Sequence, residues 1–287
     1  MELKDYSSGL NPTWCKGCGD FSVLRSLQAA VARLEIAREN LAVVSGIGCS
    51  GRISGYMNAY SFHSVHGRSL PVAQGIKLSN SKLSVIAAGG DGDGFAIGTS
   101  HTIHAIRRNI DMTYIVMNNQ VYGLTKGHVS PVSHQGFQTK MTPDGSVDMP
   151  IEPGMLALGA GISFYAQGFS AYQEELIEMI MQAIQHPGFS LVQVFSPCVT
   201  YNKVNTYQWF RDKLQRAEDL REGSISDRMT AADILTKSKG LCTGIIIQNK
   251  NKPSYHTLHN EKEENLFSHQ PCISEKEFHQ LTKAYMV

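Results

Sequence analysis

The stretch Leu83-Ser-Val-Ile-Ala-Ala-Gly-Gly-Asp-Gly-Asp-Gly94 decides the fold, because it joins a continuously apolar strand to a glycine-rich turn. The residues from Phe95 to Arg108 are predicted to form a helix. A second apolar strand follows from Met112 to Met117 and runs into Asn118-Asn119. Strand, helix and strand at this spacing are typical of a parallel βαβ unit.

The same alternation continues on both sides of this unit. Its predicted elements are, in chain order, a helix with Asp20 as its N-cap, a strand Leu41–Ser45, a helix Pro71–Leu78, a helix Pro153–Gly161, a strand Ile162–Ala166, a helix Tyr172–His186 and a strand Phe189–Phe195. The pattern predicts an α/β fold with a doubly wound parallel sheet. We expect residues 1–199 to form this domain and residues 200–287, which lack a clear strand-helix rhythm, to form an irregular C-terminal extension against the domain or a partner. The loop from Val121 to Pro150 is long enough to suggest a function.

Composition excludes several classes of protein. The 26 basic and 25 acidic side chains give a net charge of +1 with no basic stripe, which argues against nucleic-acid binding. No apolar run approaches the roughly 20 residues of a membrane helix. The start of the chain, Met1 to Asp5, lacks the apolar core of a signal peptide. We therefore expect a cytoplasmic protein, in which a Cys-x-x-Cys pair indicates a metal or redox motif rather than a disulfide.

Chemistry-bearing residues follow the predicted strands at their carboxyl ends. Cys49, the Gly-Asp-Gly turn, Asn119 and Cys198 all occupy such positions. The carboxyl ends of parallel strands share one edge of the sheet, and ligands bind in the crevice there. Two sites, one for a diphosphate and one for a metal, should therefore be neighbours.

The first site is a diphosphate–magnesium motif. Glycines allow a backbone to approach phosphate oxygens, and Asp91 with Asn119 offers the carboxylate and amide oxygens that Mg²⁺ prefers. The Val121 carbonyl could add a third oxygen, and Asp93 is the alternative carboxylate. The competing interpretation is a plain βα turn with an N-capping Asp. A dinucleotide fingerprint fits poorly, because the glycine spacing differs and the acidic residue lies inside the turn.

The second site is a set of four cysteines, Cys15, Cys18, Cys49 and Cys198. Four thiolates suit zinc or an iron–sulfur cluster. A single close pair favours a [4Fe–4S] cluster, since structural zinc usually draws on two such pairs. The alternative is a bare dithiol with two buried cysteines. Cys242 and Cys272 lie in the polar tail, and we expect both to be structural.

Five segments carry a family resemblance: Trp14-Cys-Lys-Gly-Cys-Gly19, Gly46-Ile-Gly-Cys-Ser-Gly-Arg52, His66-Gly-Arg-Ser-Leu-Pro-Val-Ala-Gln-Gly-Ile-Lys77, Gly89-Gly-Asp-Gly-Asp-Gly94 and Asn118-Asn-Gln-Val-Tyr-Gly-Leu-Thr-Lys126. In order and spacing, over roughly the first 200 residues, the chain resembles the β subunit of the 2-oxoacid:ferredoxin oxidoreductases. The resemblance implies a thiamin diphosphate-binding fold. It also implies oxidative decarboxylation of a 2-oxoacid, with coenzyme A as co-substrate and ferredoxin as electron acceptor.

The resemblance also implies which residues hold the cofactors. One [4Fe–4S] cluster would be held by Cys15, Cys18, Cys49 and Cys198, and Mg²⁺ by Asp91, Asn119 and the Val121 carbonyl. We assign to thiamin diphosphate binding the residues Gly48, Cys49, Ser50, His66, Gly90, Asp91, Gly92, Asp93, Gly94, Asn119, Val121, Gly123, Leu124 and Thr125. Arg52, Lys126 and His66 are the candidate catalytic residues, with a solvated side chain as the alternative for each.

The chain is expected to act with an external ferredoxin and a second subunit. It has no eight-cysteine ferredoxin-like segment, so electrons should leave one cluster for an external ferredoxin. The resemblance implies that an α subunit supplies the pyrimidine-binding domain and the activating glutamate, in an (αβ)₂ assembly. The preferred substrate is 2-oxoglutarate, then pyruvate. The alternatives are a non-redox thiamin diphosphate decarboxylase subunit with structural zinc, and a non-catalytic zinc-stabilised interaction module.

Overall fold

One eight-stranded sheet organises the molecule, which we describe from a computed structural model covering residues 1–258 and 274–283. The strands are β1 (Leu41–Ser45), β2 (Tyr60–His63), β3 (Ser84–Gly90), β4 (Met112–Asn118), β5 (Phe164–Phe169), β6 (Phe189–Phe195), β7 (Gln215–Arg216) and β8 (Cys242–Gln248), in the spatial order β2-β1-β3-β4-β6-β5-β8-β7. Every pairing is parallel except that of β5 with β8. The predicted doubly wound α/β sheet is confirmed.

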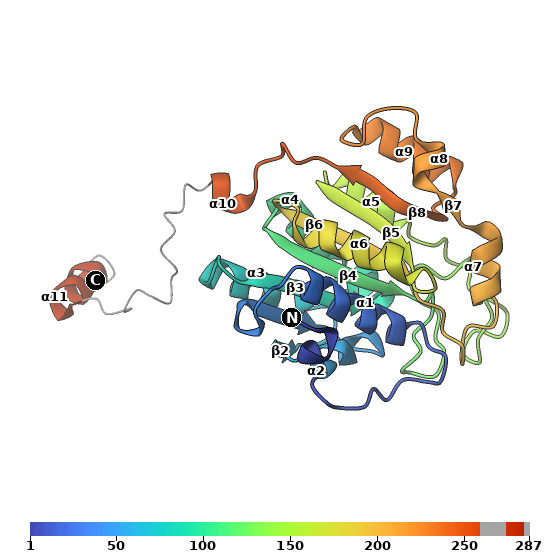
Figure 1. Cartoon of the computed structure of the whole chain (residues 1–287), viewed down its shortest axis with the longest axis horizontal. Coiled ribbons are helices and arrows are strands. Elements are labelled where there is room, and N and C mark those ends of the chain that lie inside the picture. The colour runs from blue at the N-terminus through green and yellow to red at the C-terminus, as the bar shows by residue number, and fades with distance from the viewer. Residues whose placement is uncertain (259–273, 284–287) are drawn as a thin grey trace.

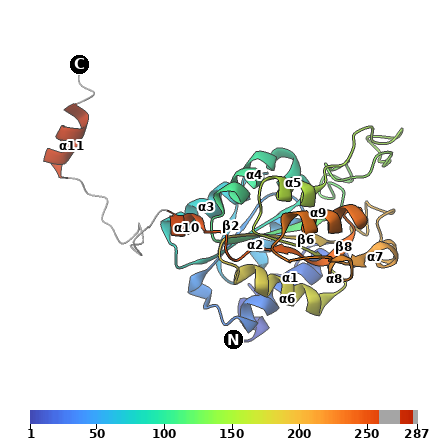
Figure 2. The ribbon, with the colours of Figure 1, turned by 90° about the horizontal axis from the view of Figure 1, so that it is seen from above.

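Helices cover both faces of the sheet, as Figures 1 and 2 show. The longer ones are α1 (Asp20–Arg33), α3 (Ser69–Ser79), α4 (Thr99–Arg108), α5 (Pro153–Gly159), α6 (Gln173–Ile184), α7 (Tyr207–Lys213), α9 (Arg228–Lys237) and α11 (Glu275–Lys283); the short ones are α2 (Ile53–Tyr56), α8 (Ala217–Leu220) and α10 (Tyr255–Leu258). Helices α1 and α6 pack on one face and α3, α4, α5 and α9 on the other. Two apolar layers therefore enclose the central strands, whose residues are buried throughout β1, β4, β5 and β6.

The region after Thr200 differs from expectation, because it contributes to the sheet. Strand β8 runs antiparallel to β5, with Phe164 opposite Gln248. Its sequence holds three consecutive isoleucines, Ile245 to Ile247, which pack into the core. This apolar run is the feature of the sequence from which strand β8 could have been predicted. The division of the chain into domains at residue 199 stays a prediction, and Cys272 lies outside the described residues.

Two helix starts also differ from the prediction. Gly19, not Asp20, is the N-cap of α1, and Asp20 is its first residue. The carboxylate of Asp20 instead accepts a hydrogen bond from the Ser196 hydroxyl at 2.6 Å. The helix predicted from Phe95 begins as a π-helical turn, Asp93–Ile97, before α4. Such turns are frequent at functional sites. Within the described ranges, no helix combines the length and apolarity needed to cross a membrane.

At the amino edge of the sheet, away from the predicted sites, the Asn109 side chain forms hydrogen bonds with three other segments of the chain. It ends α4 in the left-handed conformation, with φ of 52°, and only 2% of it is exposed. Its Oδ1 accepts hydrogen bonds from the Ser163 hydroxyl at 2.6 Å and the Phe189 amide at 3.0 Å. Its Nδ2 donates to the Pro253 carbonyl at 3.0 Å.

Replacing Asn109 by alanine is expected to lower the free energy of unfolding by about 3 kcal/mol or more, because buried donors and an acceptor lose their partner. Urea denaturation measures this change. Asn109→Gly accepts the left-handed backbone but loses the same hydrogen bonds, so it should recover only about 1 kcal/mol. A loss below about 1 kcal/mol in both variants would show that water replaces the side chain.

Candidate functional site

A cavity of about 160 Å³ opens at the carboxyl edge of the sheet, beyond β1, β3 and β4. Its lining consists of Ile47, Gly48, Cys49, Ser50, His66, Gly90, Asp91, Gly92, Asp93, Asn119, Val121, Tyr122, Gly123, Leu124 and Thr125. Of the residues assigned to cofactor binding, only Gly94 is not part of this lining. The tertiary structure thus brings together segments that are far apart in the sequence.

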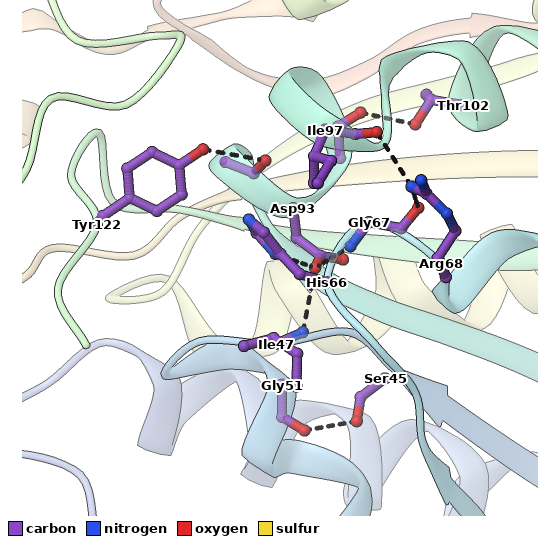
Figure 3. A network of polar contacts seen from close by, with 12 residues as sticks. Ser45, Ile47, Gly51, His66, Gly67, Arg68, Asp93, Ile97, Thr102 and Tyr122 are labelled. Carbon is purple, nitrogen blue, oxygen red and sulfur yellow. Dashed lines mark hydrogen bonds and ion pairs between the residues drawn. The ribbon is translucent and has the colours of Figure 1, made fainter. Parts of the chain in front are cut away.

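Asp93 connects three of these segments, as Figure 3 shows. Its Oδ1 accepts hydrogen bonds from the Gly67 amide at 2.8 Å and the Ile47 amide at 3.1 Å, and it lies 2.8 Å from His66 Nδ1. A Cβ on Gly46 would lie only 2.0 Å from Asp93 Oδ2, so the carboxylate packs directly against the glycine backbone. Asp93 is therefore engaged in holding the loops of the site together.

Asp91 is as buried as Asp93, since each is 2% exposed, and the Oδ2 atom of each carboxylate has no hydrogen-bond partner among the described residues. Burial raises the pKa of Asp91 to about 6, although hydrogen bonds from the Ser130 hydroxyl and nearby backbone amides oppose the rise. A buried carboxylate oxygen without a partner is costly unless a cation is nearby. Asp91 fits a metal ligand better than Asp93 does, because Asp93 Oδ1 already accepts from the Ile47 and Gly67 amides and lies against His66.

Asn119 and Val121 lie beside Asp91 in the cavity wall. The Val121 amide donates to Asn119 Oδ1 at 3.1 Å, which folds the backbone after β4 into a tight turn. Gln120 lies between them with φ of 57°, in the left-handed region. Tyr122 follows, and its hydroxyl donates to the Gly92 carbonyl at 3.3 Å, which joins this turn to the Gly-Asp-Gly segment.

The three candidate catalytic residues are placed differently. His66 lines the cavity. Arg52 is exposed outside the lining, where its guanidinium donates to the Thr13 hydroxyl. Lys126 is exposed at the end of a turn in which its amide donates to the Gly123 carbonyl at 3.0 Å, and its φ is 71°. A left-handed conformation at a residue other than glycine stores strain, and such residues cluster at functional sites.

The four cysteines gather on the other side of Gly123. A Cβ on Gly123 would lie 3.5 Å from Cys198 Sγ and 3.6 Å from Cys49 Sγ, so the glycine leaves the space beside both sulfurs open. Burial raises the pKa of Cys49 to about 11, and Asp20 and the neighbouring Cys198 and Cys15 raise it further. Burial and Asp20 likewise raise the pKa of Cys18, with a contribution from Cys198 and Cys49. Each thiol is therefore within electrostatic range of others in the set.

The four thiols do not form a site for a single ion as they stand. Zinc bound at about 2.3 Å holds its ligand sulfurs about 3.8 Å apart. In the part of the chain that the structure describes, no group of three or more His, Cys, Asp or Glu side chains converges closely enough to hold one metal ion. The donor set consists of soft sulfur ligands, which fits an iron–sulfur group.

Two further residues of the site, Tyr122 and Ser130, were not predicted from the sequence. Tyr122 lies inside the quoted segment after β4 and was available from it. Ser130 contacts Asp91 from the long loop, and no sequence pattern indicated it. A larger cavity, of about 460 Å³, lies between the end of the long loop and helices α7 and α9, and none of the predicted site residues lines it.

Comparison with known proteins agrees with this geometry. Residues 46–194 match the family described as thiamine pyrophosphate enzyme, C-terminal TPP binding domain, and residues 198–264 match the family described as the C-terminal part of the pyruvate ferredoxin oxidoreductase beta subunit. The β subunit of 2-oxoacid:ferredoxin oxidoreductase 2 from Aeropyrum pernix is 44% identical over 210 residues, which cover 73% of this chain and 68% of that relative. The 2-oxoglutarate synthase subunit KorB of Archaeoglobus fulgidus is 46% identical over 206 residues, covering 71% and 76%.

A solved structure extends the similarity to nearly the whole chain. The 2-oxoglutarate:ferredoxin oxidoreductase from Magnetococcus marinus, with 2-oxoglutarate, coenzyme A and succinyl-CoA bound, superimposes with a TM-score of 0.89 at 35% identity, covering 98% of this chain and 96% of that one. The fold, the cavity after the Gly-Asp-Gly turn and these matches lead to one assignment. The chain belongs to the β subunits of the 2-oxoacid:ferredoxin oxidoreductases, which are thiamine pyrophosphate-dependent enzymes.

Proposed function

We propose that this β subunit acts with an α subunit to convert 2-oxoglutarate and coenzyme A to succinyl-CoA and CO₂. The reaction releases one proton and two electrons, which two ferredoxin molecules accept one at a time. 2-Oxoglutarate is preferred because KorB relatives and the solved neighbour are named for it. Pyruvate is the second candidate. The observation that carries the proposal is that Cys49 lines the cavity while its sulfur lies beside Cys198, so one loop joins both sites.

Asp91, Asn119 and the Val121 carbonyl would hold Mg²⁺ against the diphosphate. This ligand set is supported by the shared position of the three residues in the cavity wall and by the unpartnered Asp91 Oδ2, while Asp93 Oδ1 is occupied by two backbone amides. When bound, thiamin diphosphate supplies the carbanionic carbon that lets a 2-oxoacid lose CO₂. Asp93 positions His66: because a carboxylate only accepts hydrogen bonds, His66 Nδ1 carries the proton, and Nε2 is left to interact with the substrate side of the cavity.

Cys15, Cys18, Cys49 and Cys198 would hold one [4Fe–4S] cluster, which supplies a one-electron acceptor beside the cavity. The competing proposal is a structural zinc, which requires at least three ligands around one ion, and no such group is found among the described residues. Iron and acid-labile sulfide content separates these two proposals directly. We further expect the enzyme in the cytoplasm, where thiols stay reduced.

In this proposal the cofactor site is shared with the α subunit. Thiamin requires a carboxylate to polarise its aminopyrimidine, and the residues that line the cavity include no glutamate. Ile47 and Leu124, at the cavity, are 37% and 48% exposed, which suits a surface that a second polypeptide covers. We expect an αβ unit, paired as (αβ)₂.

Expression of this chain alone is expected to give no 2-oxoglutarate-dependent reduction of methyl viologen, whereas co-expression with its α subunit restores turnover. The dye assay with coenzyme A, 2-oxoglutarate or pyruvate measures both activity and substrate preference. Robust turnover by the isolated chain would contradict the proposed interface site. Equal kcat/KM for both acids would remove the preference for 2-oxoglutarate.

Lys126 is proposed to bind the substrate carboxylate. We expect Lys126→Ala to raise the KM for 2-oxoglutarate by at least ~10-fold, the factor that 1.4 kcal/mol represents, because a charge-assisted hydrogen bond is lost. Lys126→Gly removes the same cation without straining the left-handed backbone and should behave alike. Lys140→Ala changes an exposed lysine elsewhere on the same loop and should leave KM unchanged. An unaltered KM in both Lys126 variants would show that the ammonium faces only solvent.

A further inference from the structure

The loops around the cysteines carry basic side chains and no acidic ones. Residues 9–19, 46–52, 119–128 and 196–211 contain no aspartate or glutamate, although the chain as a whole holds 25 acidic and 26 basic residues. The cations in these loops are Lys16, Arg52, Lys126, Lys203 and Arg211. The carboxyl edge of the sheet therefore has a local positive charge that the net charge of +1 conceals.

Three of these cations lie in the turn from Cys15 to Cys18 or in segments that contact it, and we call them the cationic rim: Lys16, Lys203 and Arg211. Lys16 lies within the turn itself. The Lys203 ammonium donates to the Val199 carbonyl, and a Val199 methyl lies 3.8 Å from the position of a Cβ on Gly17. Arg211 lies one helical turn after Tyr207 in α7, and the Tyr207 hydroxyl donates to the Gly17 carbonyl at 3.3 Å. Figure 1 shows α7 and the loop before α1 at the same end of the sheet.

The cations of the rim are exposed, and none forms an ion pair with the described residues. Acidic side chains nearby are buried or engaged elsewhere. Asp20, which directly follows the first of these loops and lies beside Cys18, is fully buried and accepts a hydrogen bond from the Ser196 hydroxyl at 2.6 Å. On α6, Glu174 pairs with Arg33 at 2.8 Å and Glu175 pairs with Arg216 at 2.6 Å. Asp212, the acid on α7, accepts a hydrogen bond from Gln208 at 2.7 Å. The positive charge of the rim is therefore not neutralised within this part of the chain.

The rim also marks the side on which the cysteine site approaches the surface. Cys15, Lys16 and Gly17 are exposed, whereas Cys198 is 8% exposed and Cys49 faces the cavity. Electron transfer between proteins weakens steeply with distance, so a carrier must dock where the cluster lies nearest to solvent. The exposed turn with three unpaired cations meets that condition.

We propose that the cationic rim is the docking surface for a small acidic electron-carrier protein. The inference rests on the proposed function, because it assumes a redox cluster on the four cysteines. Unpaired surface cations steer an acidic partner to the site and accelerate association, an effect that salt screens. An acidic face on the carrier would place its own redox centre against the turn Cys15 to Cys18.

The test is a charge reversal, Lys203→Glu with Arg211→Glu, in the co-expressed αβ enzyme. With a purified acidic [4Fe–4S] ferredoxin at low salt, kcat/KM is expected to fall at least ~10-fold, while methyl viologen reduction stays within ~2-fold of wild type. Wild-type kcat/KM should fall steeply with added NaCl, and that of the variant should not. The control is Lys82→Glu with Lys250→Glu, two exposed lysines near the opposite edge of the sheet, which should change neither assay.

The outcomes separate the two proposals. If the wild-type enzyme does not reduce viologen, the proposed function fails first. If viologen reduction is intact and the charge-reversed enzyme retains its ferredoxin kinetics and salt dependence, the docking surface is wrong. Loss of the α subunit on purification of the variant would instead make the rim a subunit interface. If charge reversal lowers the iron content, the neutral double variant Lys203→Gln with Arg211→Gln is tested instead. Its kcat/KM for ferredoxin is expected to fall about 3- to 10-fold, with viologen reduction unchanged.

Discussion

Asp91→Asn is expected to abolish activity of the αβ enzyme by weakening thiamin diphosphate–Mg²⁺ binding at least ~100-fold, or about 2.7 kcal/mol. The amide keeps the size of the side chain but removes the charge that faces Mg²⁺, whose preferred ligands are anionic oxygens. Calorimetric titration of the cofactor into the apoenzyme measures the loss. Asp93→Asn is the matched control: its remaining Oδ1 can still accept from the Gly67 and Ile47 amides, so cofactor binding should persist. The opposite pattern would transfer the magnesium role to Asp93.

Without cofactor, the same Asp91→Asn substitution is expected to increase the free energy of unfolding at neutral pH. The folded-state pKa of Asp91 is raised from 3.8 to about 6. The contribution of this carboxyl group to the stability of the apoprotein is therefore fully present below about pH 4 and is lost as the pH rises through 6. The loss is on the order of 3 kcal/mol at neutral pH, from a shift of roughly two units at 1.36 kcal/mol each. Asp91→Asn should remove this pH dependence and unfold at a higher urea concentration at pH 7. A less stable variant would mean that the carboxylate has a favourable partner without metal.

Cys198→Ser is expected to lose most of the protein-bound iron and all reduction of ferredoxin and viologen. A hydroxyl is a poor ligand for iron–sulfur clusters, whose iron is held by thiolates. Thiamin diphosphate binding should be largely retained, because Asp91 and Asn119 are separate ligands. Iron and sulfide analysis of anaerobically purified enzyme, with its EPR spectrum, measures the effect.

Cys242→Ser provides the control for this change. Cys242 is fully buried and its thiol donates to Gln167 Oε1 at 3.2 Å, a hydrogen bond that serine can replace. Iron content and activity should therefore stay at the wild-type level. A colourless wild-type protein with one zinc per chain would end the cluster proposal and favour the non-redox alternative.

Local pattern made much of the site predictable. The strands before Gly46, the Gly-Asp-Gly turn and Asn119 are continuous apolar runs, which is the composition of strands buried on both faces of a parallel sheet. Because parallel strands end at one edge, the sequence placed their following loops in one crevice, and the cavity lining agrees with the residues assigned to it.

The remaining features could not be predicted from local sequence, because they depend on contacts between distant segments. Strand β2, Tyr60–His63, was not predicted, since its four residues are all exposed at the sheet edge and its sequence lacks an apolar run. Strand β8 was missed because a short apolar run in a polar tail pairs antiparallel with β5, a choice that depends on the partner strand. Lys126 and Arg52 were predicted near the site, but whether each lines the cavity depends on how its loop folds.

By itself, the sequence determined the parallel sheet and the edge at which the loops after its strands meet, because hydrophobic periodicity is a local property and parallel strands end at one edge. Only the tertiary structure distinguished Asp91 from Asp93. The two carboxylates are two residues apart in a glycine-rich turn, and nothing local separates them. A π-helical turn directs Asp93 Oδ1 onto amides from two other loops, whereas Asp91 lies in the cavity wall with Asn119 and Val121, so the proposed division of roles follows from contacts between distant segments.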